Sequence, residues 1–151
     1  MTASRDLTDD GPDDEHLRPA GVSDETVAAL GKLSEALEVA EDARGHLYAF
    51  HRLTGQADLA LGDAVDQLRA AGHHGIADRI ETELVGRNVI EGRWTFQIVE
   101  DYDDGYHAEF VELERMARDE LVAGRRHLFE AEMKEERRTH DRRHHEARPP
   151  E

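Results

Sequence analysis

Apolar residues recur at steps of three and four residues along most of the chain, and this spacing limits the folds it can adopt. The period places apolar side chains along one side of an α-helix, which must pack against another helix. No segment alternates apolar and polar residues with the period of two that a half-buried strand shows. The sequence therefore predicts an all-α fold.

The first helix is expected to span about residues 24–53. Ser23 supplies a hydroxyl that can cap the helix, and acidic residues follow in the first turn, where they meet the positive end of the helix dipole. Thr54 and Gly55 are expected to close this helix, because glycine adopts the backbone conformation of a helix C-terminus.

Two more helical segments follow. The second covers about residues 57–85 and is interrupted by a break at Gly72. The third carries its apolar residues over 94–121, and it either ends near Gly124 or continues beyond it as a charged helix. Because helices with short connections pack as antiparallel neighbours, we expect a three- to four-helix up-down bundle.

The polar ends of the chain are expected to lie outside this bundle. Residues 1–22 are rich in aspartate, proline and glycine and predict a disordered acidic leader. Residues 23–124 contain the bundle. Residues 125–151 are expected to form a charged helix that frays into a disordered tail.

Composition excludes several classes of protein. The chain has no cysteine, which rules out a disulfide scaffold, a thiolate zinc site and a cysteine nucleophile. Its net charge of −16 should repel phosphate backbones, so nucleic-acid binding is disfavoured. The first twenty residues contain no apolar run, so we expect no signal peptide and no contact with a membrane. A cytoplasmic location follows from these features.

A few polar residues of the first helix fall on its apolar side. At about 100° per residue, Arg44 and His51 lie inside the apolar stripe, with Tyr48 beside it and Glu41 at its edge. A buried guanidinium needs an acceptor. Either Arg44 pairs with an acid and His51 is a core histidine, or these residues bind an anionic ligand together with the 86–93 connection. The candidate ligand-binding residues are Glu41, Arg44, Tyr48, His51, Arg87, Asn88 and Arg93.

Acidic residues of the third helix suggest a metal at first sight. Asp103 and His107 have the spacing of one helical turn, with Glu100 and Asp104 on the same face. The angular count places this face opposite the apolar stripe that starts at Trp94, so we expect it to be solvent-exposed. No cofactor or metal site is therefore predicted, although a divalent ion remains an alternative.

Catalytic fingerprints are missing. The sequence has no nucleophile elbow, phosphate-binding loop, metalloprotease motif or dinucleotide fingerprint. The Glu-x-x-His pair that a ferritin-like metal site needs does not occur before any of the ten histidines. The chain is therefore expected not to be an enzyme.

Aromatic residues concentrate in the first half of the third helix, where they either fill the bundle centre or anchor an interface. We predict a non-enzymatic protein that acts through a protein partner or through self-association as a homodimer. The alternatives are a ferritin-like metal-binding bundle and a module for a small anionic ligand. The candidate interface residues are Trp94, Phe96, Tyr102, Tyr106 and Phe110.

Overall fold

The computed structural model describes residues 10–149, and helices dominate this range. No strand occurs among these residues, in which an isolated bridge joins Ile90 and Arg93. The predicted all-α fold is confirmed. Within the described range, no helix combines the length and the apolar character needed to cross a membrane.

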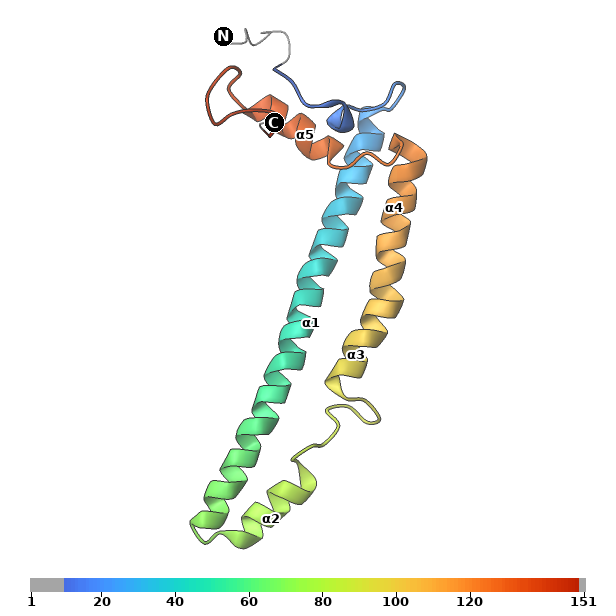
Figure 1. Cartoon of the computed structure of the whole chain (residues 1–151). Helices are drawn as coiled ribbons and strands as arrows, with labels where there is room; N and C mark the ends of the chain where they lie inside the picture. The colour runs from blue at the N-terminus through green and yellow to red at the C-terminus, as the bar shows by residue number, and fades with distance from the viewer. Residues whose placement is uncertain (1–9, 150–151) are drawn as a thin grey trace, which may run out of the picture. The chain divides into compact units, whose positions relative to one another are not determined.

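The chain divides into two compact units. Unit 1 contains the chain up to Glu38 and from Phe110 onward, and unit 2 contains Val39–Glu109. The first helix, α1 (Asp24–Ala70), contributes residues to both units (Figure 1). Each unit has its own buried residues and its own ion pairs.

Helix α1 is longer than the sequence suggested, with 47 residues. Its predicted cap is confirmed, because the Ser23 hydroxyl accepts a hydrogen bond of 3.1 Å from the backbone N–H of Thr26. The predicted end at Thr54 and Gly55 is wrong. Thr54 instead donates its hydroxyl to the carbonyl of Phe50, 2.7 Å away, as a threonine inside a helix does. A helical glycine costs only about 1 kcal/mol, which packing of the following turns outweighs.

Helix α1 ends at the glycine predicted to break it. Gly72 has a φ of 90°, in the left-handed region. The N–H of Gly72 donates to the carbonyl of Arg69, and the N–H of His73 donates to that of Leu68, at 3.0 and 2.9 Å. This pair of hydrogen bonds is the Schellman motif, which satisfies the last carbonyls of the helix.

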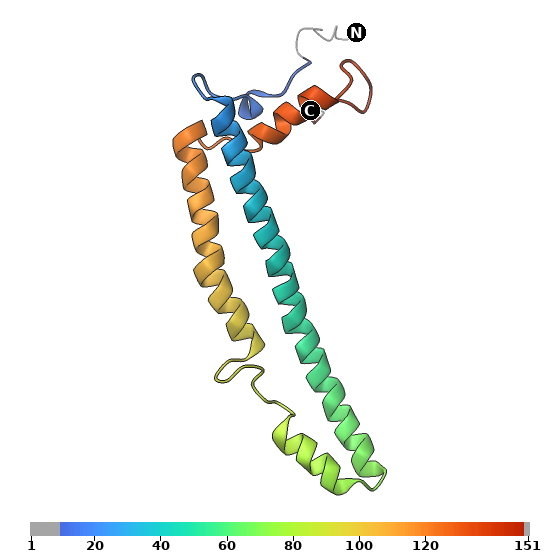
Figure 2. The same cartoon turned by 180° about the vertical axis from the view of Figure 1, so that it is seen from behind.

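Unit 1 is built from the start of α1, from α4 (Ala108–Val122) and from α5 (Leu128–Arg137). Figures 1 and 2 both show α4 beside the first part of α1. The third helix does not continue through Gly124, because Ala123 and Gly124 have φ angles of 54° and 75° and end α4. The core of unit 1 consists of Val27, Leu30, Val122 and Leu128, with Val22 and Ala117 packed against it.

The segment before α1 is attached to α5 by charge. The Arg18 guanidinium donates two hydrogen bonds to the Glu132 carboxylate, at 2.7 and 2.9 Å, in the bidentate geometry typical of such pairs. Residues 10–22, expected to belong to a disordered leader, therefore have defined partners in this structure. Residues 1–9 of that leader lie outside the described residues.

Arg138 joins both terminal segments of unit 1. Its side chain is completely buried and forms ion pairs with Asp10 and Glu135, at 2.9 and 2.7 Å. The hydrogen bond from Arg138 lowers the pKa of Asp10. Farther along the chain, Arg148 donates to the carbonyl of Gly11, 3.1 Å away. Unit 1 thus depends on ion pairs as well as on its small apolar core.

Unit 2 contains the remainder of α1 together with α2 (His74–Glu83), α3 (Thr95–Tyr102) and the π-helical segment η2 (Asp103–His107). Both α2 and α3 lie along α1 (Figures 1 and 2). The predicted second helix is therefore divided: its first part belongs to α1, and its second part is α2. The buried apolar residues of this unit are Ala40, Val65, Ala77 and Val99.

Within unit 2, α1 carries two parallel series of residues at alternating steps of three and four. The first, which we call the inner stripe, faces α2, α3 and their connection and is buried or half-buried throughout: Ala40, Arg44, Leu47, His51, Thr54, Asp58, Leu61, Val65 and Leu68. The second, which we call the outer stripe, is exposed at every position: Val39, Ala43, His46, Phe50, Leu53, Ala57, Ala60 and Ala64.

Candidate functional site

A polar cluster in unit 2 is centred on Arg44 of the inner stripe. Its Nε atom donates to Oδ1 of Asp103 at 2.7 Å, and its Nη2 atom donates to Oδ2 at 3.2 Å. The hydroxyl of Tyr48 donates to the same Oδ2 atom at 2.7 Å. The hydrogen bonds from Arg44 and then Tyr48 lower the pKa of Asp103 to about 2. Arg44 therefore pairs with an acid from another segment, as one of the two interpretations expected.

Glu41 and His107 form the second half of this cluster. The Nε2 atom of His107 is hydrogen-bonded to the Glu41 carboxylate, and the His107 side chain is only 15% exposed. The hydrogen bond to His107 lowers the pKa of Glu41, with a smaller contribution from the charge of Arg44. The acceptor Asp103 raises the pKa of the Tyr48 hydroxyl. These groups satisfy one another and hold η2 against α1.

The expected solvent-exposed acidic face is wrong for Asp103 and His107, which both face α1. The angular count started at Trp94, but Trp94 is the N-cap of α3 and lies outside the helix. In addition, η2 is a π-helix, whose turn contains more residues than an α-helical turn, so a count at 100° per residue places the following residues on the wrong side. The buried residue nearest to the start of the helix is Val99, so the inward face is rotated by about one residue.

Two further polar residues of the inner stripe have partners from the connection and α3. His51 Nδ1 lies 2.7 Å from the Thr95 hydroxyl, so His51 connects α1 to the first residue of α3. Asp58 accepts a hydrogen bond of 2.9 Å from the N–H of Gly86, just after α2. Sequence reasoning missed Asp58 and Thr95. The signal available for Asp58 was its inner-stripe position, which the early helix end concealed.

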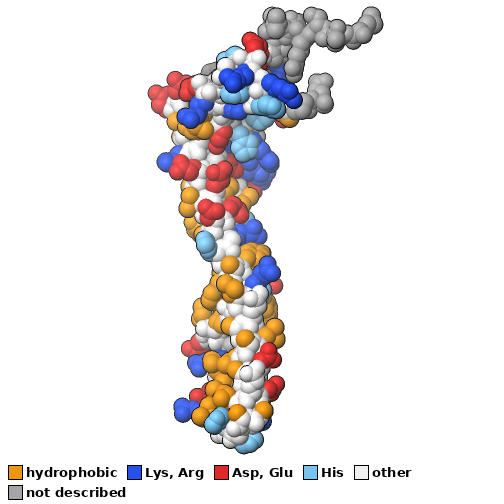
Figure 3. Space-filling model, turned by 90° about the vertical axis from the view of Figure 1, so that its left-hand side faces the viewer, with side chains coloured by type: hydrophobic (Ala, Val, Ile, Leu, Met, Phe, Trp, Pro, Cys, Tyr) orange, Lys and Arg blue, Asp and Glu red, His pale blue; other side chains and the backbone are white. Residues whose placement is uncertain are grey.

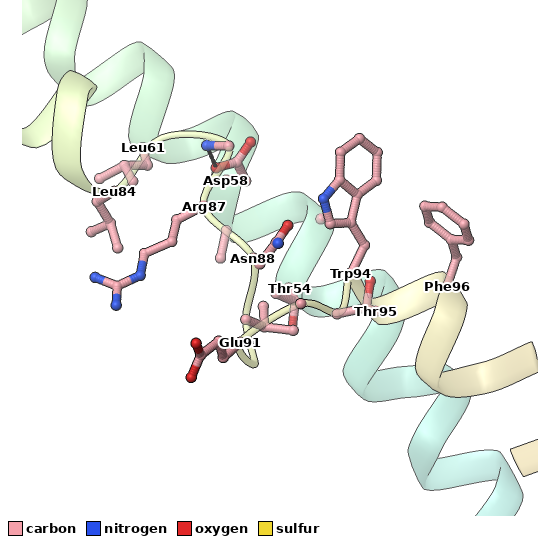
Figure 4. A pocket seen from close by; sticks show the side chains of 15 residues that line it. Thr54, Asp58, Leu61, Leu84, Arg87, Asn88, Glu91, Trp94, Thr95 and Phe96 are labelled. Atoms are coloured by element: carbon pink, nitrogen blue, oxygen red, sulfur yellow. Dashed lines mark hydrogen bonds between the residues drawn. The ribbon is translucent and has the colours of Figure 1, made fainter. Parts of the chain in front are cut away.

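The remaining candidate ligand-binding residues do not converge on Arg44. Arg87 and Asn88 line a groove of about 1190 Å³ beside α1, whereas Arg93 pairs with Asp101 at 3.2 Å. Figure 4 shows Arg87 and Glu91 extending to one side of this groove and the aromatic residues to the other. The apolar lining of the groove includes Ala57, Leu61, Leu84, Val89, Trp94 and Phe96.

The candidate interface aromatics fall into two groups. Trp94 and Phe96 are 57% and 40% exposed, and their rings meet edge to face with centroids 5.4 Å apart. Tyr106 is exposed as well. Tyr102 and Phe110 are half-buried. The exposed members therefore belong to unit 2 and lie on its surface.

Metal binding gains no support from this geometry. Among residues 10–149, no group of three histidine, aspartate or glutamate side chains is arranged to hold an ion. In the same range, no buried side-chain polar atom lacks a hydrogen-bond partner. The groups of the polar cluster are instead hydrogen-bonded to one another.

The outer stripe is an exposed, mainly apolar surface of unit 2. Val39 and Leu53 are 62% and 61% exposed, and Phe50 is 44% exposed. Figure 3 shows hydrophobic side chains at the surface of unit 2, in the lower part of the view. The spacing of these residues can be read from the sequence. The predicted helix end at Gly55, however, divides the outer stripe into two shorter parts, so the sequence did not indicate one continuous surface.

Comparison of the chain with known proteins identifies no relative. The chain matches no known family model, and no curated protein or solved structure shows significant similarity to it.

Proposed function

We propose that this protein is a non-enzymatic interaction protein of the cytoplasm, whose unit 2 binds an amphipathic partner helix along the outer stripe. The observation that carries the proposal is the stripe itself. Eight residues at heptad spacing extend over about seven helical turns, and all of them are exposed. Seven of the eight are apolar, and none carries a permanent charge.

Because α1 carries the inner and the outer stripe on different sides, it can pack against helices on both of these sides. The inner stripe already packs against α2, α3 and their connection, which leaves the outer stripe for another helix. Knobs-into-holes packing requires this heptad period, and three to four heptads are the length at which a coiled-coil assignment becomes secure. Fully burying a phenylalanine or leucine contributes roughly 1.5–3 kcal/mol, so Phe50 and Leu53 would be the main anchors.

The groove beside α1 extends this surface. Ala57 belongs to the outer stripe and also lines the groove, where Trp94 and Phe96 are found. Aromatic residues are enriched at interface centres because they bury a large area at low entropic cost. The partner helix would therefore meet a continuous apolar surface made by the stripe and the groove edge.

A photo-activated cross-linker at position 53 of the full-length chain tests the proposal in the native host. Leu53 lies on the outer stripe, whereas its neighbour Arg52 is exposed on a different face and is the matched control. We expect a protein adduct from position 53, little from position 52, and loss of the adduct when Ala57→Asp places a charge in the stripe. The proposal is contradicted if both positions react equally or if position 53 gives no adduct.

A further inference from the structure

We infer that the partner helix is basic: beside its apolar side it carries lysine or arginine residues, about three heptads apart, that pair with Asp42 and Asp63. The inference rests on the proposed function and names the chemistry of its partner. It concerns the outer stripe of unit 2 and the row of residues that borders the stripe.

This border is a single row of residues on α1. Because the stripe has the heptad period, one residue of each heptad lies directly beside it on the side away from the inner stripe. At about 100° per residue the row contains Asp42, Ala49, Gln56 and Asp63, which are all exposed. We call this row the outer border. Its charges are two carboxylates, separated by three heptads or roughly 32 Å of helix.

The two carboxylates of the outer border have no partner within the described chain. Across residues 10–149, neither the Asp42 nor the Asp63 side chain forms an ion pair or a hydrogen bond. Acids of α1 that face the other segments of unit 2 behave differently: Glu41 pairs with His107, and Asp58 accepts from the N–H of Gly86. The outer border therefore presents acceptors that unit 2 leaves to another molecule.

The surrounding charge also favours a cationic partner. Unit 2 contains 14 acidic residues against six arginines and no lysine, a net charge of −8 with histidine neutral. Four of these arginines are already paired with acids: Arg44, Arg69, Arg79 and Arg93. An acidic helix, including a second copy of α1, would be repelled, whereas a basic helix is attracted over a distance and pairs at the border.

The stripe and its border have different roles in binding. Burial of apolar residues supplies most of the affinity, because an exposed ion pair at the rim changes the dissociation constant by about five-fold at most. Charges beside the apolar seam of paired helices instead decide which helix is accepted. The outer border therefore selects among amphipathic helices that the stripe alone would bind equally.

Two synthetic peptides and the full-length chain test the inference. Both peptides are amphipathic helices of about four heptads with the same leucine and alanine positions, and they differ only in carrying lysine or glutamate beside the apolar side. By fluorescence anisotropy we expect the lysine peptide to bind and the glutamate peptide not to bind measurably. The double variant Asp42→Lys, Asp63→Lys should weaken binding of the lysine peptide more than about 10-fold and give the glutamate peptide measurable affinity.

Two controls separate the border from bulk charge. The double variant Glu100→Lys, Asp104→Lys changes the net charge equally at exposed residues of α3 and η2, outside α1, and should still prefer the lysine peptide. Leu53→Asp places a charge inside the stripe and should abolish binding of that peptide. Circular dichroism checks that each variant is helical.

Each outcome has a definite meaning. The inference is overturned if the native chain does not bind the lysine peptide, if Leu53→Asp binds it equally, or if the two double variants lose the same affinity. The proposed function survives these results when the cross-linker at position 53 captures a neutral or acidic partner helix. Absence of any adduct at position 53 contradicts the proposed function and the inference together.

Discussion

At the scale of single residues, the polar groups inside unit 2 serve to align the segments along α1. Arg44, His51 and Asp58 occur at inner-stripe positions where an apolar residue would be expected, and each bonds to a different part of the segment between α2 and α4. A buried or half-buried polar group without its partner is costly. Each pair therefore disfavours alternative alignments of that segment on the helix.

The Asp103 carboxylate makes the stability of unit 2 depend on pH. Its pKa is lowered from 3.8 to about 2 in the folded protein, so the stabilisation is fully present above pH 4 and is lost as the pH falls toward 2. Asp103→Asn should lower stability at neutral pH and flatten its pH dependence between these values. Urea unfolding followed by circular dichroism across that range measures the effect. Asp104→Asn, at an exposed neighbour, should preserve the slope; if it removes the slope equally, the assignment to Asp103 fails.

Gly31 is required for close packing in unit 1. A Cβ atom added there would lie 2.8 and 2.9 Å from Cγ and Cβ of Phe129, atoms too close to the backbone to move freely. Gly31→Ala should lower the free energy of unfolding by about 1–2 kcal/mol, because overpacking outweighs the gain in helix propensity. Gly45→Ala is the matched control, since nothing lies within 4 Å of its added Cβ, and it should be neutral or stabilising. Equal effects of the two substitutions would contradict this packing.

At the scale of elements, helix ends were predictable where one residue supplies the capping hydrogen bond or backbone conformation. Ser23 and Gly72 mark the ends of α1 for these local reasons. Thr54 and Gly55 resemble an end locally, but neighbouring segments packed on the inner stripe keep that region helical. The inward face of η2 could not be predicted, because counting at a fixed angle does not anticipate a π-helical turn.

Continuity of α1 through Gly55 has a measurable consequence. In a helix interior, Gly55→Ala should raise the free energy of unfolding by about 0.5–1 kcal/mol, since the added methyl has nothing within 4 Å. At Gly72, where φ is positive, the same substitution should destabilise by about 1 kcal/mol. Chemical denaturation of the two variants compares them directly. Destabilisation at both positions would mean that α1 ends near Gly55 after all.

At the scale of the whole molecule, the net charge and the exposed apolar surface have opposite effects on association with other molecules of the same charge. A net charge of −16 repels copies of the chain from one another, while the outer stripe leaves an apolar surface exposed. The candidate site could be predicted only in part from the sequence. Arg44 and His51 were found because they interrupt an apolar stripe, and Tyr48 and Glu41 because they lie at its border. The partners Asp103 and His107 required the three-dimensional register of η2.

Arg138 has a practical consequence for anyone who produces this protein. Its buried guanidinium shares acceptors from the beginning of the described chain and from α5, so neither terminal segment can be trimmed as if it were a passive extension. Removing Asp10 would take away one of the two carboxylates that pair with this buried cation. Shortening the ends to aid crystallisation would thus remove contacts that join the terminal segments of unit 1.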